Sequence, residues 1–197
     1  MDKIIILEAV KKNAIELDYA SKEFQNDREF VLEAVKNNGW ALKYASQNFQ
    51  NDKEIVIEAV KNDGYTLSYA SKELRNDKDI VLAAIKNDPW SLQFASKELQ
   101  NDKDIVLKAI KKNGFPLKYT SKELQNNKDI VIKAIKKNGF TLVYASNKLR
   151  MNKKMIIIAL KNISFFNYTK FKRNNSFYAS IIEYSPGKYF DNILEVY

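Results

Sequence analysis

The stretch DKEIVIEAVKNDGYTLSYASKELRN, Asp52–Asn76, decides the fold because close copies of it fill most of the chain. Asn-Asp pairs end and begin the copies every 25 residues, and Asn126-Asn127 replaces the pair once. Cutting the chain at these pairs gives six repeats between Asp2 and Met151, and a seventh that keeps only its first half, Asn152–Asn162. Self-similarity at a fixed period is the signature of a repeat architecture. Positions are numbered 1 to 25 within each repeat, so that Asp52 is position 1 of repeat 3.

Each repeat predicts two short helices. The first opens at position 1, where an aspartate can cap free backbone N–H groups, and it closes at position 12 or 13. Asn-Gly or Asp-Gly usually stands there, and we expect the glycine to adopt the left-handed conformation. Pro89 replaces that glycine in repeat 4, and since proline cannot adopt positive φ, we expect a differently built turn. The second helix is expected over positions 15 to 24, for example Ala41–Gln50.

The apolar positions indicate how these helices pack. In the first helix, positions 4, 5, 8 and 9 span about 140° at 100° per residue. A surface helix needs only about 100°, so this helix must contact neighbours on several sides. Helices this short are marginal alone, and stacking of repeats supplies the missing burial. The sequence therefore predicts an all-α fold, an α-solenoid of tandem 25-residue helix-turn-helix repeats over residues 1–162.

The last part of the chain, residues 163–197, loses the period and holds ten of the 24 Phe, Trp and Tyr residues. An open repeat array exposes the apolar face of its last repeat, and a terminal cap normally covers that face. We therefore expect a C-terminal helical cap in this segment. The alternative is an aromatic patch that binds a ligand.

The composition excludes several kinds of chemistry. The 197 residues include no cysteine and no histidine, which excludes disulfides and thiolate zinc sites and removes the commonest general base. No glycine-rich phosphate loop or metalloprotease motif is present. The serine at position 20 of each repeat has no histidine to activate it, and we expect it to bond a carbonyl of its own helix. The sequence predicts no enzyme activity, no catalytic or metal-binding residue and no cofactor.

The hydropathy pattern predicts a soluble protein. The longest uninterrupted apolar run, Met155–Leu160, has six residues, whereas a transmembrane helix needs about 20. The first residues lack the basic stretch and long apolar segment of a signal peptide. We therefore expect a cytoplasmic location and no transmembrane segment.

Two rows of aromatic residues recur along the repeats, at positions 14 and 18. The row at position 14 consists of Trp40, Tyr65, Trp90, Phe115 and Phe140. The row at position 18 consists of Tyr19, Tyr44, Tyr69, Phe94, Tyr119 and Tyr144. Such rows could stack nucleic-acid bases. Regular recurrence favours packing between repeats, with tyrosine hydroxyls that reach the surface.

The repeats differ mainly in charge. The net charge of the chain is +9, but residues 1–101 hold 14 basic and 17 acidic side chains, a net −3, whereas residues 102–197 hold 19 and 7, a net +12. Position 7 changes from glutamate in repeats 1 to 3, where it can pair with a nearby lysine, to lysine in repeats 5 and 6. The polar face of the first helix there becomes a basic patch of Lys108, Lys111, Lys112, Lys133, Lys136 and Lys137.

Four interpretations of this patch stand beside one another. It could bind an acidic protein surface, which we take as the primary hypothesis, nucleic acid or an anionic membrane, or it could reflect drift in a lysine-, asparagine- and isoleucine-rich composition. Lysine without interleaved arginine weakens the nucleic-acid hypothesis, because bidentate recognition favours arginine. The hypothesis is a non-enzymatic binding scaffold for protein–protein interaction, with nucleic-acid binding as the alternative.

The core of the repeat resembles a known family. Trp40-Ala41-Leu42-Lys43-Tyr44-Ala45-Ser46, repeated as Tyr65-Thr66-Leu67-Ser68-Tyr69-Ala70-Ser71, is similar to the repeat of the family called domain of unknown function 4116. The resemblance covers about residues 2–151. It implies a helical repeat protein, and it brings no activity and no catalytic residue.

Overall fold

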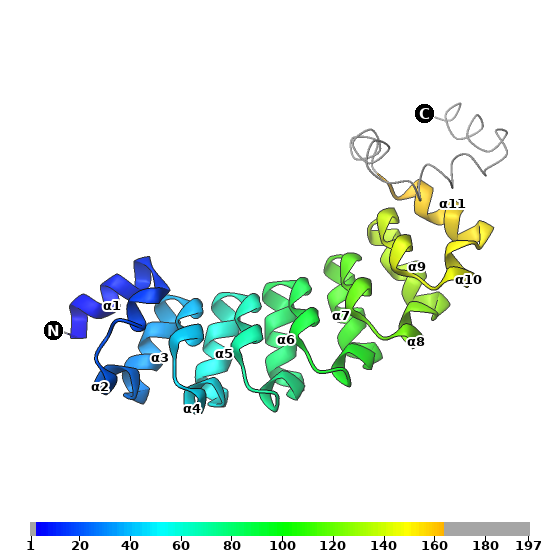
Figure 1. Ribbon diagram of the computed structural model, residues 1–197. Helices are drawn as coiled ribbons and strands as arrows, with labels where there is room; N and C mark the ends of the chain where they lie inside the picture. The colour runs from blue at the N-terminus through cyan, green and yellow to red at the C-terminus, as the bar shows by residue number, and fades with distance from the viewer. Residues whose placement is uncertain (1–2, 164–197) are drawn as a thin grey trace.

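The structure, a computed structural model, describes residues 3–163 (Figure 1). The described residues form α-helices and 3₁₀-helices without a strand, stacked into an open, curved array (Figure 1). The predicted all-α solenoid is confirmed. The predicted C-terminal cap lies outside the described residues.

Each repeat opens with an α-helix of nine or ten residues. These helices are α1 (Lys3–Lys12), α3 (Arg28–Asn37), α5 (Lys53–Asn62), α6 (Lys78–Asn87), α7 (Lys103–Lys112), α9 (Lys128–Lys137) and α11 (Lys153–Lys161). The residue at position 1 caps the helix as predicted; in repeat 3, Asp52 Oδ1 accepts hydrogen bonds from the N–H groups of Glu54 and Ile55 at 3.0 and 3.2 Å. Asn127 and Asn152 cap α9 and α11 in the same way.

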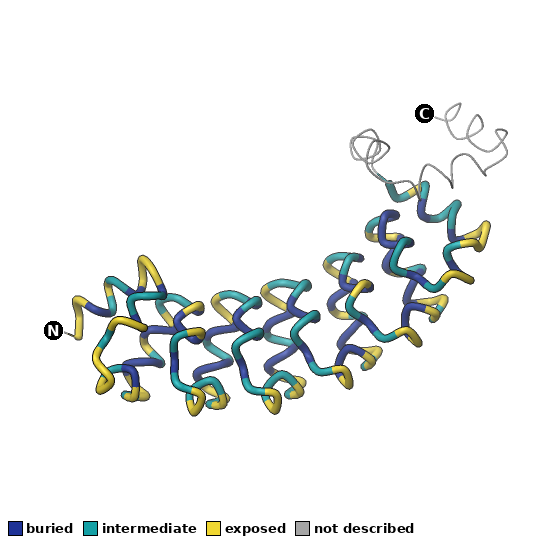
Figure 2. Tube along the Cα trace, in the orientation of Figure 1, coloured by how far each residue is buried: buried dark blue, intermediate teal, exposed yellow. Residues whose placement is uncertain are grey.

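The expected four apolar positions of this helix are buried. In α5, Ile55, Val56, Ala59 and Val60 are fully inaccessible to solvent. Position 4 of repeat 1 is Ile5, which has no preceding repeat beside it within the described residues, and 62% of it is exposed. A neighbouring repeat therefore supplies the burial, as expected for a solenoid. Figure 2 shows the buried segments running through the middle of the whole array.

The second half of the repeat differs from the prediction of one continuous helix. A 3₁₀-helix comes first, and a short closing helix follows. The 3₁₀-helices are η1 (Ala14–Leu17), η2 (Gly39–Tyr44), η3 (Gly64–Tyr69), η5 (Pro89–Phe94), η7 (Phe115–Tyr119) and η8 (Gly139–Tyr144). The closing helices are α2 (Lys22–Gln25), α4 (Gln47–Gln50), η4 (Leu74–Asn76), η6 (Leu99–Asn101), α8 (Lys122–Gln125) and α10 (Asn147–Arg150).

Side chains explain why the chain breaks between these two helices. The Ala-Ser pair at positions 19 and 20 is extended. In five repeats the serine Oγ then accepts a hydrogen bond from the backbone N–H three residues later, as Ser96 Oγ does from Leu99 N at 3.2 Å. The carbonyls left open by the break bond to the glutamine at position 24: Gln100 Nε2 donates to three of them at 3.0–3.1 Å. The side-chain amide thus replaces the backbone donors of a continuous helix.

The serine at position 20 also links neighbouring repeats, so the prediction that it bonds a carbonyl of its own helix is wrong. Ser71 Oγ donates to Oδ1 of Asn51, the last residue of the preceding repeat, at 2.6 Å. Ser121 and Ser146 make the equivalent bond, at 2.5 and 2.7 Å. The recurrence of this serine therefore has a structural cause.

The glycine at position 13 is required by close packing and not by its φ angle, which corrects the prediction. Within the described residues, no glycine has positive φ. A Cβ atom on Gly39 would lie 2.6 Å from the carbonyl oxygen of Ala59 in the next repeat, far inside contact distance. The Gly39 N–H donates to Asn62 Oδ1 at 3.1 Å, so the turn of one repeat binds directly to the helix of the next.

Pro89 does not change the turn, and the prediction of a different turn in repeat 4 is also wrong. Asp88 before it has φ −132° and ψ 117°, close to the −144° and 117° of Asp63 in repeat 3. Both are followed by six-residue 3₁₀-helices. Proline fits because it is the first residue of the helix, where the fixed φ is suitable and no intrahelical N–H is needed.

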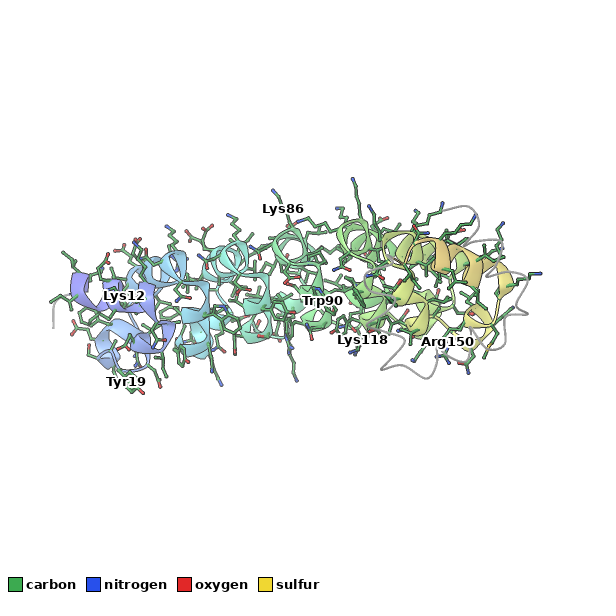
Figure 3. The ribbon with its side chains drawn as sticks, turned by 90° about the horizontal axis from the view of Figure 1, so that it is seen from above. Lys12, Tyr19, Lys86, Trp90, Lys118 and Arg150 are labelled. Atoms are coloured by element: carbon green, nitrogen blue, oxygen red, sulfur yellow. The ribbon has the colours of Figure 1, made fainter. Side chains whose placement is uncertain are left out.

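The curvature gives the array an inner and an outer side (Figure 1). The α-helices all run the same way, so that their C-terminal ends and the turns at positions 12 to 14 lie on the inner, concave side (Figures 1 and 3). The closing helices and the N-terminal ends of the α-helices lie on the outer side (Figure 1). Seen from above, Lys86 at position 10 projects from the edge that the α-helices form (Figure 3). Position 10 is lysine in every repeat, whereas position 11 is lysine in some repeats and asparagine in others.

We predict that Gly39→Ala destabilises the protein by about 1–3 kcal/mol, the usual effect of overpacking. At a glycine with unrestricted space and negative φ, the same change would stabilise by about 0.4–1 kcal/mol. Urea unfolding followed by circular dichroism measures the difference, with Ser68→Ala in η3 as a control. A Gly39→Ala variant as stable as the parent would contradict the close-packing explanation.

Candidate functional site

The six lysines predicted as a binding patch lie on α7 and α9, and all six are exposed. Lys108, Lys111 and Lys112 are spaced by three and four residues, so they share one face of α7. The equivalent lysines share the same face of α9. Those at positions 10 and 11 form the last turn of each helix, where positive charge is favourable next to the negative end of the helix dipole.

Lys112 has a structural contact that the sequence did not predict. In repeats 3 and 4, position 11 is an asparagine that binds the preceding repeat: Asn87 Oδ1 accepts from Gly64 N at 3.0 Å, and its Nδ2 donates to Lys61 O at 2.9 Å. At the next junction the proline has no N–H to donate, and position 11 is Lys112. Its ammonium donates to the carbonyl of Lys86, which is the carbonyl equivalent to that of Lys61.

The side chains of the other five lysines of the patch form no hydrogen bond and no ion pair with residues 3–163. In repeats 1 to 3, where position 7 is a glutamate, one of the three predicted ion pairs is present: Glu58 pairs with Lys61 at 2.7 Å. The predicted pairing does not occur at Glu8 or Glu33 within the described part of the chain. The positive charge of the patch is thus left unbalanced by the described residues.

A ladder of ion pairs follows the outer side of the array and ends where the chain becomes basic. Position 2 of repeats 2 to 4 pairs with the capping aspartate of the next repeat: Arg28 with Asp52 at 2.8 Å, then Lys53 with Asp77 and Lys78 with Asp102, both at 2.7 Å.

Asparagine replaces this aspartate at Asn127 and Asn152. Among residues 3–163, Lys103 and Lys128 consequently have no carboxylate partner. The excess positive charge of repeats 5 and 6 therefore extends beyond the predicted patch, to the outer side of the array.

These pairs shift the titration of the capping carboxylates. A hydrogen bond from Lys78 holds the pKa of Asp102 below its ordinary value, and one from Arg28 does the same for Asp52. A carboxylate with a lowered folded-state pKa stabilises the fold above its unfolded pKa of about 3.9. This contribution is lost as the pH falls through the folded-state value.

We predict that Asp102→Asn causes a small loss of stability at pH 7, because the amide keeps the cap, as Asn127 does, but loses the ion pair. This loss should shrink as the pH falls through the lowered folded-state pKa of Asp102, since the parent carboxylate then becomes protonated too. Asp102→Ala also removes the cap and should cost about 1 kcal/mol more at both pH values. Thermal unfolding at pH 7 and pH 2.5 tests this. A pH-independent effect of Asp102→Asn would refute the role of the ion pair.

The two aromatic rows contact each other between repeats. Ring centroids lie 5.9 Å apart for Trp40 and Tyr69 and 5.5 Å apart for Tyr65 and Phe94, both edge to face. Trp90 stacks on Phe115 at 5.4 Å. The indole N–H of Trp40 also donates to Asp63 Oδ2 at 2.7 Å. These rings pack from position 14 of one repeat to positions 14 and 18 of the next, as the packing interpretation expects.

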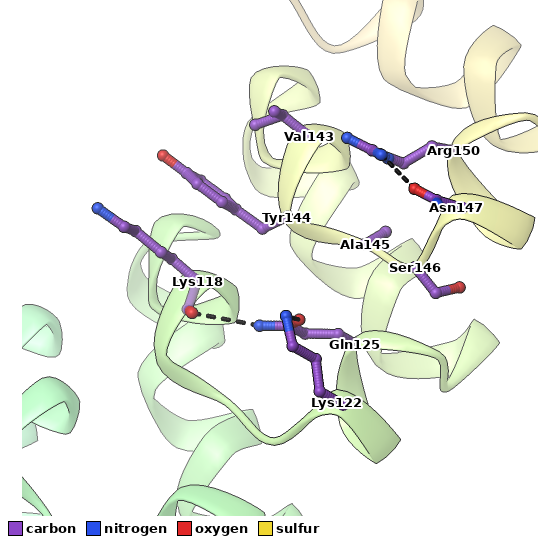
Figure 4. Close-up of a pocket in the computed structure, with 9 residues that line it drawn as sticks. All are labelled: Lys118, Lys122, Gln125, Val143, Tyr144, Ala145, Ser146, Asn147 and Arg150. Atoms are coloured by element: carbon purple, nitrogen blue, oxygen red, sulfur yellow. Dashed lines mark hydrogen bonds between the residues drawn. The ribbon is translucent and has the colours of Figure 1, made fainter.

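A pocket between repeats 5 and 6 was missed by the sequence reasoning. It measures about 500 Å³ and lies between η7–α8 and η8–α10, on the edge of the array opposite Lys86 (Figure 3). Lys118, Lys122 and Arg150 contribute positive charge to its lining, and Tyr144 forms part of its wall (Figure 4). The available signal was Arg150, which departs from the glutamine at position 24 of repeats 1, 2, 4 and 5.

No group of three or more acidic side chains in residues 3–163 lies close enough to hold a metal ion. None of the helices in this range has the length and apolar character needed to cross a membrane.

The architecture defines a class, the tandem helical repeat proteins, and comparison with protein families agrees. A family model described as domain of unknown function (DUF4116) matches residues 2–50, 27–75, 52–100, 77–125 and 127–172. The chain belongs to the DUF4116 family, as the repeat core indicated. Searches of curated proteins and of solved structures found no match.

Proposed function

We propose that the chain is a non-enzymatic binding scaffold whose lysine patch on α7 and α9, in repeats 5 and 6, binds an acidic surface of another protein. The main support for this proposal is the group of exposed lysines on α7 and α9. These lysines have no carboxylate partner among the described residues. Like charges spaced three and four apart on a helix repel. An acidic partner would relieve this repulsion and gain long-range attraction.

The architecture supports a binding role. An open array of repeats offers an extended concave surface that can follow a partner over many residues. The packed positions are nearly the same in every repeat, whereas position 7 on the exposed face changes from Glu58 in repeat 3 to Lys108 in repeat 5. Variation confined to the surface is what a scaffold with one specialised region requires.

Two observations favour protein over nucleic acid as the partner. The patch contains lysine only, and lysine lacks the planar, bidentate geometry with which arginine recognises phosphate and guanine. The aromatic rings that could have stacked on bases instead pack against rings of neighbouring repeats. Nucleic-acid binding by the same lysines is the alternative, and the experiment separates the two.

We predict that the double variant Lys111→Glu/Lys136→Glu binds a 20-residue glutamate-rich peptide at least ten-fold more weakly than the parent. The matched control is Lys11→Glu/Lys36→Glu, which changes the same position in repeats 1 and 2 and the net charge by the same amount. This control should change affinity less than three-fold. Fluorescence anisotropy at two salt concentrations gives the affinities.

Equal losses in the two double variants would refute a site in repeats 5 and 6. Tighter binding of a 20-nucleotide single strand than of the peptide at the same salt concentration would replace the proposal with the nucleic-acid alternative. The affinity for either ligand is expected to fall with increasing salt, so salt dependence does not separate the two proposals. The comparison of the two ligands and of the two double variants separates them.

A further inference from the structure

The pocket between repeats 5 and 6 concentrates positive charge at one junction. Lys118 and Lys122 come from repeat 5 and Arg150 from repeat 6, and no carboxylate lines the pocket (Figure 4). Neither lysine has a carboxylate partner among residues 3–163: Lys118 lies over the ring of Tyr119 at 5.5 Å, and Lys122 donates to Gln125 Oε1 at 3.3 Å. An anion entering the pocket would meet cations from two sides.

Arg150 sets this junction apart from those at which position 24 is a glutamine. In four repeats position 24 is a glutamine whose amide bonds three carbonyls of its own repeat, as Gln125 does at 3.2–3.3 Å. Arginine at this position replaces the amide that bonds the open backbone carbonyls with a positively charged guanidinium. Figure 4 shows the guanidinium of Arg150 extending beside Val143, with a hydrogen bond to Asn147 Oδ1. The substitution places charge in the pocket.

The same three cations do not recur at the equivalent junction. Three repeats earlier, Lys43 and Arg75 stand where Lys118 and Arg150 stand, but Gln47 replaces Lys122. Among residues 3–163, the buried Nε of Arg75 has no hydrogen-bond partner, so arginine does not fulfil the glutamine's structural role. The position therefore tolerates arginine without needing it for folding.

The size and lining of the pocket indicate the kind of anion. A planar guanidinium with two ammonium groups matches a phosphate monoester, which carries about −1.5 to −2 charges at pH 7 and three acceptor oxygens. A volume of about 500 Å³ is typical of sites that hold a whole small group, not a single ion. Val143 and the ring of Tyr144 offer apolar surface for the group that carries the phosphate.

We propose that this pocket binds a phosphorylated side chain of the partner protein. The inference rests on the proposed function for the nature of the partner, but it concerns a different set of residues, from η7, α8, η8 and α10 instead of α7 and α9. The pocket adds a specific anchor on one edge of the array to the diffuse attraction of the lysine patch.

A phosphotyrosine peptide and its unphosphorylated twin test the proposal by calorimetry on the full chain. The phosphorylated peptide should bind at least ten-fold more tightly. Arg150→Gln installs the residue found in repeats 1, 2, 4 and 5 and so should fold normally. It should abolish this preference, and Lys118→Gln should reduce it. The control Arg75→Gln makes the same change three repeats away and should leave the preference intact.

Several outcomes would overturn the proposal: equal affinity for the two peptides, a preference that survives Arg150→Gln, or tighter binding of free adenosine 5′-monophosphate than of the phosphopeptide. The Lys111→Glu/Lys136→Glu variant separates this failure from that of the proposed function. Suppose that this variant binds the glutamate-rich peptide as tightly as the parent does and still binds the phosphorylated peptide more tightly than its unphosphorylated twin. The lysine patch is then refuted as the binding site, and the pocket is supported. The reverse pattern refutes the pocket alone.

Discussion

The contact between the turn of one repeat and the α-helix of the next is the constraint on which the rest of the structure depends. Helices of ten residues are marginal alone, and each α-helix of repeats 2 to 6 has four apolar positions covered by neighbours. Gly39 allows the backbones to approach until its N–H reaches Asn62. This spacing also lets Ser71 bond Asn51 and Lys53 pair with Asp77. Each repeat thus covers apolar side chains of its neighbour, and this burial requires no β-sheet.

A common helix direction separates the two sides of the array. Helix N-termini occupy the outer side and helix C-termini the inner side (Figure 1). The caps and the ion-pair ladder belong to the N-termini, and the lysines at position 10 belong to the last helical turns. One lysine per repeat is enough to complement the helix dipole, as Lys61 does in α5. The second and third lysines of α7 and α9 exceed that need. This excess, more than the presence of lysine, distinguishes repeats 5 and 6 and motivates a binding role.

Departures from the repeat pattern are coupled across junctions. Where Pro89 removes an N–H, the asparagine that would have accepted it is replaced by Lys112, which keeps the bond to the carbonyl of the preceding helix. Where Arg150 replaces glutamine, a charged pocket forms with Lys118 of the preceding repeat. In a solenoid, side chains at the junctions contact the neighbouring repeat as well as their own. The structural cause of a substitution can therefore lie in either repeat.

The sequence by itself determined the architecture, the capping role of Asp52 and its equivalents, the buried positions and the basic face of repeats 5 and 6. These follow from period, helical spacing and charge, which are properties of residue order. Only the tertiary structure decided why Gly39 is glycine, why Ser71 recurs, how Lys112 is held and that Lys118 and Arg150 share a pocket.

Each of those answers depends on atoms about 20 or more residues apart in the chain, whose approach is set by the distance and rotation between repeats. A 25-residue pattern fixes which residues are equivalent. It does not fix that distance. The extended Ala70-Ser71 pair and its equivalents also divide the expected second helix into two, which changes the position of the second half of each repeat relative to the first.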